Sequence, residues 1–336
     1  MIVCDTIDPN PSSYIIAMKI ISIFSPIPTL VALFCIITCP ARMGSQYRIN
    51  LLLYQIWSLL FDFVFSLCVT PVLFYPMTMG YLAGIGRNFN GSLYPLTVFI
   101  FLNIALIGVA VLNMLLTRYY AIIPAEHFLR KHSKAYIILV IGWYIMYIGS
   151  LTSTGVLIYP NILENSPNYE KKFTCAAAVM VYAADSFQYT SFMPLVYNAA
   201  FLLIFTLVVG CSLIYLTFSA ISASTHLSEK TKNLQRVFLI HVVLQGMIPI
   251  VFLAIPILIL LSIFVFSIVN TQSIGNVCMC TMALCGTVSG AVVLIFNKPY
   301  QKHLIYIFRN SKSYTNRIST IAATSDLQMD FLRSRK

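Results

Sequence analysis

Seven long apolar segments, separated by short stretches that carry the charges, constrain the fold of this 336-residue chain more than any other feature. A helix of roughly 20 residues crosses the hydrocarbon core of a bilayer, and each segment is at least that long. The longest, 237–266, is too short for two crossings. We therefore expect seven spans, near residues 14–39, 50–74, 96–120, 135–159, 193–219, 237–266 and 273–297.

The composition favours a membrane protein and excludes a soluble one. Apolar residues make up 59% of the chain and charged residues 9%, whereas soluble domains are about 45–50% apolar and about 25% charged. The sequence therefore predicts an all-α membrane protein, a seven-transmembrane helix bundle within residues 1–310. The Ser/Thr-rich remainder, 311–336, lacks a sustained apolar period and is expected to be a flexible cytoplasmic tail.

The basic residues indicate how the bundle is oriented. Lys and Arg number 21 against 10 Asp and Glu, which gives a net charge of +11. Seventeen of the basic residues fall on one side of the predicted spans, while the loops of the other side carry only Arg87, Lys171 and Lys172. Because basic residues are retained on the cytoplasmic face, we expect the N-terminus outside and the C-terminus inside. The surplus charge is then a topology signal and does not indicate a nucleic acid partner.

A glycosylation sequon agrees with this orientation. Asn90-Gly91-Ser92 is the usable acceptor site, and it falls in a loop assigned to the outside. Asn90 is therefore a candidate for glycosylation.

An apolar stripe follows the seventh span. Tyr300, Leu304, Ile307 and Phe308 recur at helical spacing, with Lys302 and Arg309 on another face. This pattern predicts a short amphipathic helix over 299–309 that lies on the inner leaflet.

Short sequence patterns recur in a fixed order along the whole chain. The first group is Thr38-Cys39-Pro40, Met43, Trp57, Asp62, Pro71, Tyr75-Pro76, Gly80-Tyr81 and Gly84. The second group is Thr231, Leu234-Gln235, Phe238, Gln245, Ile248-Pro249, Pro256, Asn276, Gly286 and Lys298-Pro299-Tyr300. In this order and spacing the chain resembles the nematode serpentine chemoreceptors of the Str superfamily, most closely class H, with class I next. Gln301 and Cys285 depart from that pattern, which usually has arginine and histidine there.

The resemblance implies a chemosensory G-protein-coupled receptor. Such a receptor binds a small, lipophilic, odorant-like or pheromone-like molecule in the outer half of the bundle and activates a heterotrimeric G protein. It resides as a multi-pass protein in the plasma membrane, by family resemblance in the cilium of a sensory neuron. The alternative is a ligand-gated ion channel or a small-molecule transporter subunit. A charge-lined pore is disfavoured, because Asp62 is the only acid well inside a predicted span.

The predicted inner ends of spans three and six carry the candidates for G-protein coupling. They are Arg118, Tyr119, Thr231, Lys232 and Arg236. Thr117-Arg118-Tyr119 stands where rhodopsin-like receptors have an acid before the arginine, so Arg118 lacks the usual carboxylate neighbour. Arg118 could hold the inner helix ends together and then meet the G protein, or it could be an arginine that only reaches toward the lipid headgroups.

Three residues inside spans are candidates for a conformational switch. Asp62 lies midway along span two, where a carboxyl group is costly unless it is paired, protonated or hydrated. It could be an ion-linked switch or a neutral, hydrogen-bonded packing residue. Pro249 and Pro256 are seven residues apart on one face of span six, where they should bend the helix. That bend is either a hinge or a static kink.

The ligand candidates are polar or aromatic side chains in the outer half of the bundle. They are Asn103, Asp185, Tyr197, Asn198, Phe264, Gln272 and Asn276. Gln272 and Asn276 are four residues apart and share a helix face, and Asp185 could pair with a cationic odorant. The opposing interpretation is an interhelical hydrogen bond for Asn103 and a solvated loop acid for Asp185.

Other chemistry finds little support in the sequence. The nine cysteines and five histidines lack the spacing of a metal site, and no hydrolase or phosphate-loop motif occurs, so we expect neither an enzyme nor a cofactor. In rhodopsin-like receptors generally, a disulfide customarily joins the outer end of span three to the loop before span five. Here no cysteine lies near the outer end of span three, so Cys175 lacks this partner. A disulfide between Cys175 and Cys4 is an alternative that the sequence leaves undecided.

Overall fold

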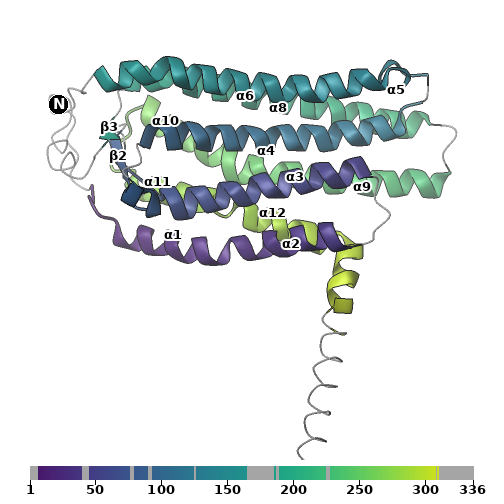
Figure 1. Cartoon of the computed structure of the whole chain (residues 1–336), viewed down its shortest axis with the longest axis horizontal. Helices are drawn as coiled ribbons and strands as arrows, with labels where there is room; N and C mark the ends of the chain where they lie inside the picture. Colours follow the sequence, from purple (N-terminus) through teal and green to yellow (C-terminus); the bar gives the residue numbers. More distant parts are fainter. Residues whose placement is uncertain are drawn as a thin grey trace, which may run out of the picture.

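The computed structural model describes residues 7–39, 45–75, 79–89, 93–124, 126–164, 185–186, 189–224, 228–307 and 309. Within these residues, seven helical stretches are long and apolar enough to cross a membrane. They are Ser12–Thr38, Gln46–Val69, Pro95–Ile122, Lys134–Leu157, Pro194–Ala223, Glu229–Val265 and Gln272–Phe296. The predicted seven-helix bundle is confirmed, and Figure 1 shows the helices running side by side along one common direction.

Spans three, four and five are single unbroken helices. They are α4 (Leu93–Ile122), α6 (Ser133–Glu164) and α8 (Tyr189–Ala223), with the one-turn helix α5 (Phe128–Lys131) between α4 and α6. Helix α4 is the most buried of the seven spans and packs against α3, α6, α8 and α9. Helices α6 and α8 are the least buried, and large apolar side chains cover their outer faces, as expected for helices that face lipid.

Spans one and seven are each interrupted near the middle. Span one consists of α1 (Ser12–Phe24) and α2 (Pro26–Thr38), which meet at Ser25. Pro26 and Pro28 lack the N–H groups that would continue the regular backbone hydrogen bonds across this junction. Span seven consists of α11 (Gln272–Met282) and α12 (Cys285–Phe296).

Spans two and six contain wide π-helical turns. Span two changes from α3 (Ser45–Asp62) to the π-helix η1 (Phe63–Val69) directly after Asp62. Span six consists of α9 (Glu229–Pro249), the π-helix η4 (Ile250–Ala254) and α10 (Ile255–Val265). Pro256 cannot donate to a carbonyl inside η4, so regular α-helix is interrupted where the sequence places its two prolines.

A small antiparallel sheet lies at one end of the bundle. Its order is β1 (Pro71–Leu73), β2 (Met79–Leu82) and β3 (Asp185–Ser186), with Val72 paired to Tyr81 and Gly80 to Asp185. The sequence did not predict these strands, because span two was expected to run to residue 74. Its helix instead ends at Val69, and Thr70 adopts a positive φ of 39° before the chain turns into β1. The 3-10 helix η2 (Ile85–Phe89) follows β2.

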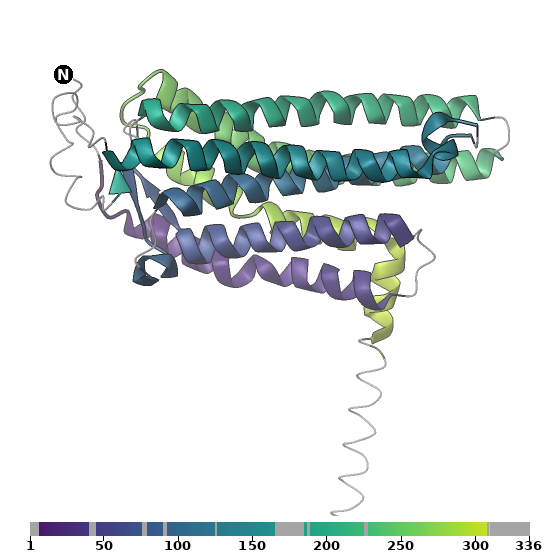
Figure 2. The ribbon, with the colours of Figure 1, turned by 45° about the horizontal axis from the view of Figure 1, so that its top comes forward.

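The two ends of the bundle differ in charge and in structure. The N-terminal end carries the sheet and the first described residues, and the C-terminal end carries α5, the start of α9 and a helix over 298–307 (Figure 1). That last helix turns away from α12, with Tyr300 buried and Lys302 exposed, as expected for the predicted amphipathic helix (Figure 2). The described basic side chains at the C-terminal end are Arg48, Arg118, Arg130, Lys131, Lys134, Lys230, Lys232, Arg236, Lys298, Lys302 and Arg309.

Candidate functional site

Asp62 lies at the point where spans one, two and seven meet. Its side chain is 0% exposed. The Ser25 hydroxyl donates to one carboxyl oxygen at 2.5 Å, and the Gly286 backbone N–H donates to the other at 3.0 Å. The Thr287 hydroxyl in turn donates to Ser25 Oγ at 2.6 Å. We call Ser25, Asp62, Gly286 and Thr287 the Asp62 network.

The Asp62 network depends on two close approaches of helix backbone. A Cβ atom on Gly286 would lie 2.7 Å from the Asp62 carboxyl carbon, and a Cβ on Gly290 would lie 2.6 Å from the Thr29 backbone nitrogen. The Thr29 hydroxyl donates to the Gly286 carbonyl at 2.7 Å. Glycines therefore let α12 approach α2 and α3 closely enough for these hydrogen bonds to form.

Further buried hydrogen bonds extend from this region toward the other spans. Gln55 Nε2 donates to Ser289 Oγ at 2.9 Å and joins α3 to α12. The Tyr54 hydroxyl donates to the Gln245 carbonyl at 3.1 Å and joins α3 to α9. Asn50 Nδ2 donates to Thr117 Oγ1 at 2.7 Å and joins α3 to α4. Span two is thus the centre of the polar contacts in the bundle.

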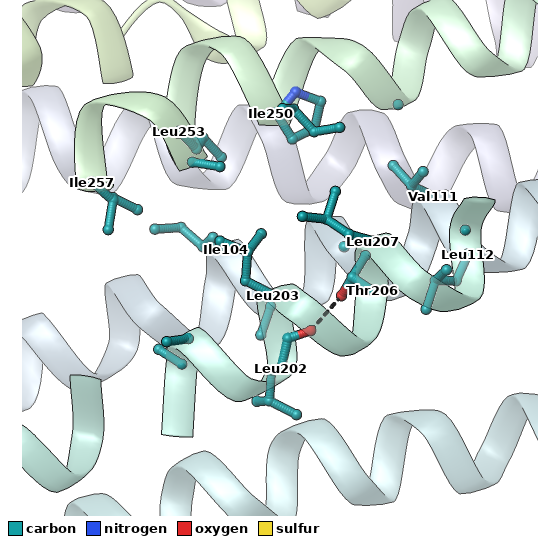
Figure 3. A pocket seen from close by; sticks show the side chains of 18 of the residues that line it. Ile104, Val111, Leu112, Leu202, Leu203, Thr206, Leu207, Ile250, Leu253 and Ile257 are labelled. Carbon is teal, nitrogen blue, oxygen red and sulfur yellow. Dashed lines mark hydrogen bonds between the residues drawn. The ribbon is translucent and has the colours of Figure 1, made fainter. Parts of the chain in front are cut away.

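A cavity of about 220 Å³ lies between α4, α8 and span six, with α6 closing one side. Figure 3 shows Val111 and Leu112 of α4, Leu203 and Leu207 of α8 and the η4 residue Leu253 around one shared space. The cavity lies near mid-depth of the bundle, because its walls use the central turns of each helix. Gly108, Gly210 and Gly246 come from three different helices, and their missing side chains help to leave the space open.

The cavity wall contains two hydroxyl groups, and both are already hydrogen-bonded. Thr206 Oγ1 lies 2.6 Å from the Tyr147 hydroxyl and donates to the Leu202 carbonyl at 2.7 Å. The contact between Thr206 and Tyr147 joins α8 to α6. Apart from them the wall is made of aliphatic and aromatic side chains, glycines, Pro249 and the Cys211 thiol.

The seven predicted ligand residues occupy several separate positions. Asn103 is buried on α4, and its Oδ1 atom has no hydrogen-bond partner among the described residues. Tyr197 is exposed on the outer face of α8, and the Asn198 side-chain amide donates to the Ser150 carbonyl and to Thr154 Oγ1 on α6. Asp185 belongs to β3.

The remaining three lie near the N-terminal end. The Phe264 ring packs against the Tyr75 ring in a tilted arrangement at 5.1 Å between centroids, and Gln272 forms two 2.8 Å hydrogen bonds with the backbone of Asp8. Asn276 is half-buried one turn after Gln272. Among the residues that the structure describes, the cavity wall includes none of the seven.

Arg118 forms a clamp at the C-terminal end of the bundle. Its guanidinium carbon lies 3.8 Å from the centroid of the Tyr47 ring on α3 and 4.9 Å from the centroid of the Phe238 ring on α9. No carboxylate pairs with Arg118 among the described residues, where the salt bridge found joins Lys232 to Glu229. Two aromatic faces therefore take the place of the acidic partner that the sequence lacks. We call Tyr47, Arg118 and Phe238 the Arg118 clamp.

The other predicted coupling residues lie around the Arg118 clamp. The Tyr119 hydroxyl is 3.2 Å from His127 Nε2, and Thr231 lies in the first turn of α9, where Ser228 caps the helix. Arg236 is exposed on α9, one turn after Lys232. The predicted residues Asn90, Cys4 and Cys175 and the tail 311–336 lie outside the described residues.

Two features of the site were missed by reasoning from sequence. The cavity had a weak signal, namely a glycine in the middle of each of spans three, five and six. No sequence signal pointed to the aromatic partners of Arg118, because Tyr47 and Phe238 are far from it in the chain and aromatic residues are common throughout.

Comparison with known proteins identifies one family. The model of the serpentine type 7TM GPCR chemoreceptor Srh family matches residues 9–310, which is most of the chain. No curated protein matches the chain closely enough to count as a relative.

Proposed function

The chain belongs to the Srh family of serpentine seven-transmembrane GPCR chemoreceptors, and from this premise we propose that the cavity between α4, α8 and span six holds its ligand. The chain is accordingly a chemosensory membrane receptor and not an enzyme. In the proposal a small lipophilic molecule binds there and a heterotrimeric G protein couples at the C-terminal end. The observation that carries the proposal is the 220 Å³ apolar cavity beside the π-helix η4.

Helix α9 offers a direct mechanical link between the cavity and the Arg118 clamp. Val242 and Gly246 line the cavity, and Phe238 is one turn before Val242 on the same helix face. A ligand that displaces α9 at Val242 also moves Phe238 relative to Arg118. Release of Arg118 from the clamp frees a multidentate donor at the edge of the membrane for the G protein. Tyr119, Thr231, Lys232 and Arg236 are the further contacts in this proposal.

The remaining predicted sites have supporting roles in the proposal. The Asp62 network holds spans one, two and seven in the resting arrangement, and its release acts as a switch. Pro249 and Pro256 let span six bend at η4 when the cavity fills. The seven predicted ligand residues stay predictions, with Asn103 supported by its buried amide oxygen, which has no hydrogen-bond partner among the described residues.

The proposed orientation places the N-terminal end outside the cell and the C-terminal end in the cytosol. The basic side chains gathered at the C-terminal end support it, and so does the sequon at Asn90. Residence in the plasma membrane of a sensory cilium is part of the same proposal. Loss of a glycan in Asn90→Gln, together with protease protection of a C-terminal tag, tests the orientation. A protease-sensitive tag in intact cells would contradict it.

The coupling test compares ligand binding with signalling. Full-length receptor is screened against volatile and water-soluble compounds with a G-protein readout, and any active compound is then applied to Arg118→Ala. We expect signalling to fall and ligand affinity to change little, because Arg118 is not among the residues that line the cavity. The surface amount of receptor must be matched, because loss of a basic residue can impair insertion. Full signalling by Arg118→Ala, or a ligand-evoked current in cells that lack G proteins, would contradict the proposal.

A further inference from the structure

We propose that the ligand reaches this cavity sideways from the bilayer, between α8 and span six, and that it is an uncharged, hydrocarbon-like molecule of roughly nine non-hydrogen atoms. This inference rests on the proposed function, because it takes the cavity to be the ligand site. It adds the chemical class of the ligand and its route.

The cavity wall extends outward to the lipid-facing surface on one side. Leu207 on α8 is 37% exposed, Met247 on α9 is 45% exposed and Leu258 on α10 is 52% exposed, yet all three also line the cavity. Cys211, one turn after Leu207, is exposed as well. These residues form a mouth between α8 and span six that faces the hydrocarbon core of the membrane.

Among the described residues, the N-terminal end of the bundle is closed by packed side chains. Phe74 and Tyr75, which follow β1, are fully buried, and the Tyr75 ring packs at a tilt against Phe264 of α10. The Tyr14 hydroxyl donates to the Pro71 carbonyl at 2.7 Å and anchors β1 to α1. Toward this end the cavity wall includes Val196, which is buried. A ligand therefore meets packed side chains at the N-terminal end and an open mouth at the lipid-facing side.

The polar groups of the wall limit the chemistry of the ligand. The Thr206 proton goes to the Leu202 carbonyl, and the Tyr147 hydroxyl is within donating distance of Thr206 Oγ1. Neither hydroxyl keeps a free proton for a ligand carbonyl or carboxylate. A charged group in this space would meet no side chain of opposite charge in the wall, and leaving it unpaired costs far more than the burial of the remaining atoms contributes. The wall thus selects against organic acids and amines.

The volume limits the size of the ligand. A cavity of about 150 Å³ with a comparable aliphatic and aromatic wall stays dry and binds benzene. By proportion, about 220 Å³ accommodates a molecule about half as large again, such as a substituted benzene or a short branched hydrocarbon. Molecules of this kind partition strongly into bilayers, which makes the membrane their natural reservoir.

The experiment uses purified full-length receptor in lipid nanodiscs and two fluorinated probes, 4-fluorotoluene and 4-fluorobenzoate, observed by fluorine NMR. We expect 4-fluorotoluene to bind saturably above its partition into empty nanodiscs, and 4-fluorobenzoate not to bind. Gly108→Leu fills the cavity, because a Cβ there meets Thr206 only at 3.6 Å. We expect it to weaken binding about tenfold or more. Gly142→Leu is the matched control, because a Cβ there meets nothing within 4 Å on the exposed face of α6.

A second pair of variants tests the route. Leu207→Trp narrows the mouth, whereas the adjacent Val208→Trp places the same bulk on the outer face of α8, away from the cavity wall. We expect exchange of 4-fluorotoluene to slow about tenfold in Leu207→Trp only. Equal exchange rates in the two variants would overturn the route, and binding that is absent, or unaffected by Gly108→Leu, would overturn the ligand class. Because no G protein is present, these failures are distinct from a failure of the proposed signalling.

Discussion

Two parts of the bundle are held together by different physical means. Spans one, two and seven are joined by buried hydrogen bonds, with the Asp62 network at their centre. Spans three, five and six meet through apolar side chains around a cavity. Among the described side chains, no hydrogen bond joins the stretch 104–115 of α4 to α8 or α9.

This difference separates a fixed part of the bundle from a deformable one. A buried hydrogen bond has one good geometry, so a helix that shifts loses the bond and leaves polar groups unpaired. Apolar side chains around a void can change rotamer or shift position at lower cost, because no directional contact is lost. The part with the cavity is therefore the one in which a ligand can first move a helix, while the other part is the reference for that movement as long as the Asp62 network holds.

The largest expected effect is that of Gly286→Ala, which breaks the hydrogen-bonded part directly. A Cβ at this position would lie 2.7 Å from the Asp62 carboxyl carbon, so α12 must move away from α3. Overpacking combined with loss of the Asp62 hydrogen bonds should cost about 3 kcal/mol. The measurement is the thermal unfolding midpoint of purified receptor in nanodiscs, together with the amount at the cell surface.

The control for this prediction is Gly142→Ala, which adds the same methyl group where nothing lies within 4 Å. It should be neutral or slightly stabilising, because alanine favours helix over glycine. Equal midpoints for the two variants would mean that the close approach at Gly286 is not needed.

The next effect is expected from deleting one hydroxyl of the Asp62 network with Ser25→Ala. The carboxyl group then keeps the Gly286 N–H but loses its 2.5 Å donor. The Thr287 hydroxyl loses its 2.6 Å acceptor and keeps only the Ser25 carbonyl at 3.3 Å. We expect a loss of about 2 kcal/mol, again measured as a shift of the unfolding midpoint. Ser22→Ala is the control, because the exposed Ser22 hydroxyl bonds only the Lys19 carbonyl on the same helix. If both variants unfold alike, the network does not hold these spans together.

The sequence predicted the seven spans because long apolar runs between charges have one physical solution in a bilayer. It missed the sheet because Val72, Leu73 and Phe74 suit a buried strand as well as a helix. Asp62 was identified from the cost of burying a carboxyl group, but its donors come from spans one and seven, and spacing along the chain does not reveal such partners. The glycines of spans three, five and six were only a weak signal of the cavity for the same reason, since a cavity depends on how three apolar helix faces meet.

A smaller effect is expected where the two parts meet at the C-terminal end. Phe238→Leu keeps an apolar side chain on α9 but removes one aromatic face from the Arg118 clamp. A cation–π contact is worth about 1 kcal/mol, so basal signalling should rise about fivefold without ligand. The measurement is nucleotide exchange on the G protein at matched receptor amounts. Phe218→Leu, on the outer face of α8, should leave basal signalling unchanged, and an unchanged Phe238→Leu would show that the clamp does not restrain the receptor.

The smallest effect is expected from Thr206→Val, which deletes a hydroxyl in the cavity part as Ser25→Ala does in the other. Thr206 Oγ1 contacts the Tyr147 hydroxyl at 2.6 Å, but Tyr147 can still donate to the Leu202 carbonyl at 3.3 Å after the change. No buried donor is left unpaired, so the loss should be about 0.5 kcal/mol, the usual size of an interhelical hydrogen bond in a membrane. The unfolding midpoint measures this loss, and binding of 4-fluorotoluene should be unchanged or slightly tighter. A loss as large as that of Ser25→Ala would mean that a single hydroxyl holds the cavity wall as firmly as the Asp62 network holds its spans, and the contrast between the two parts would not stand.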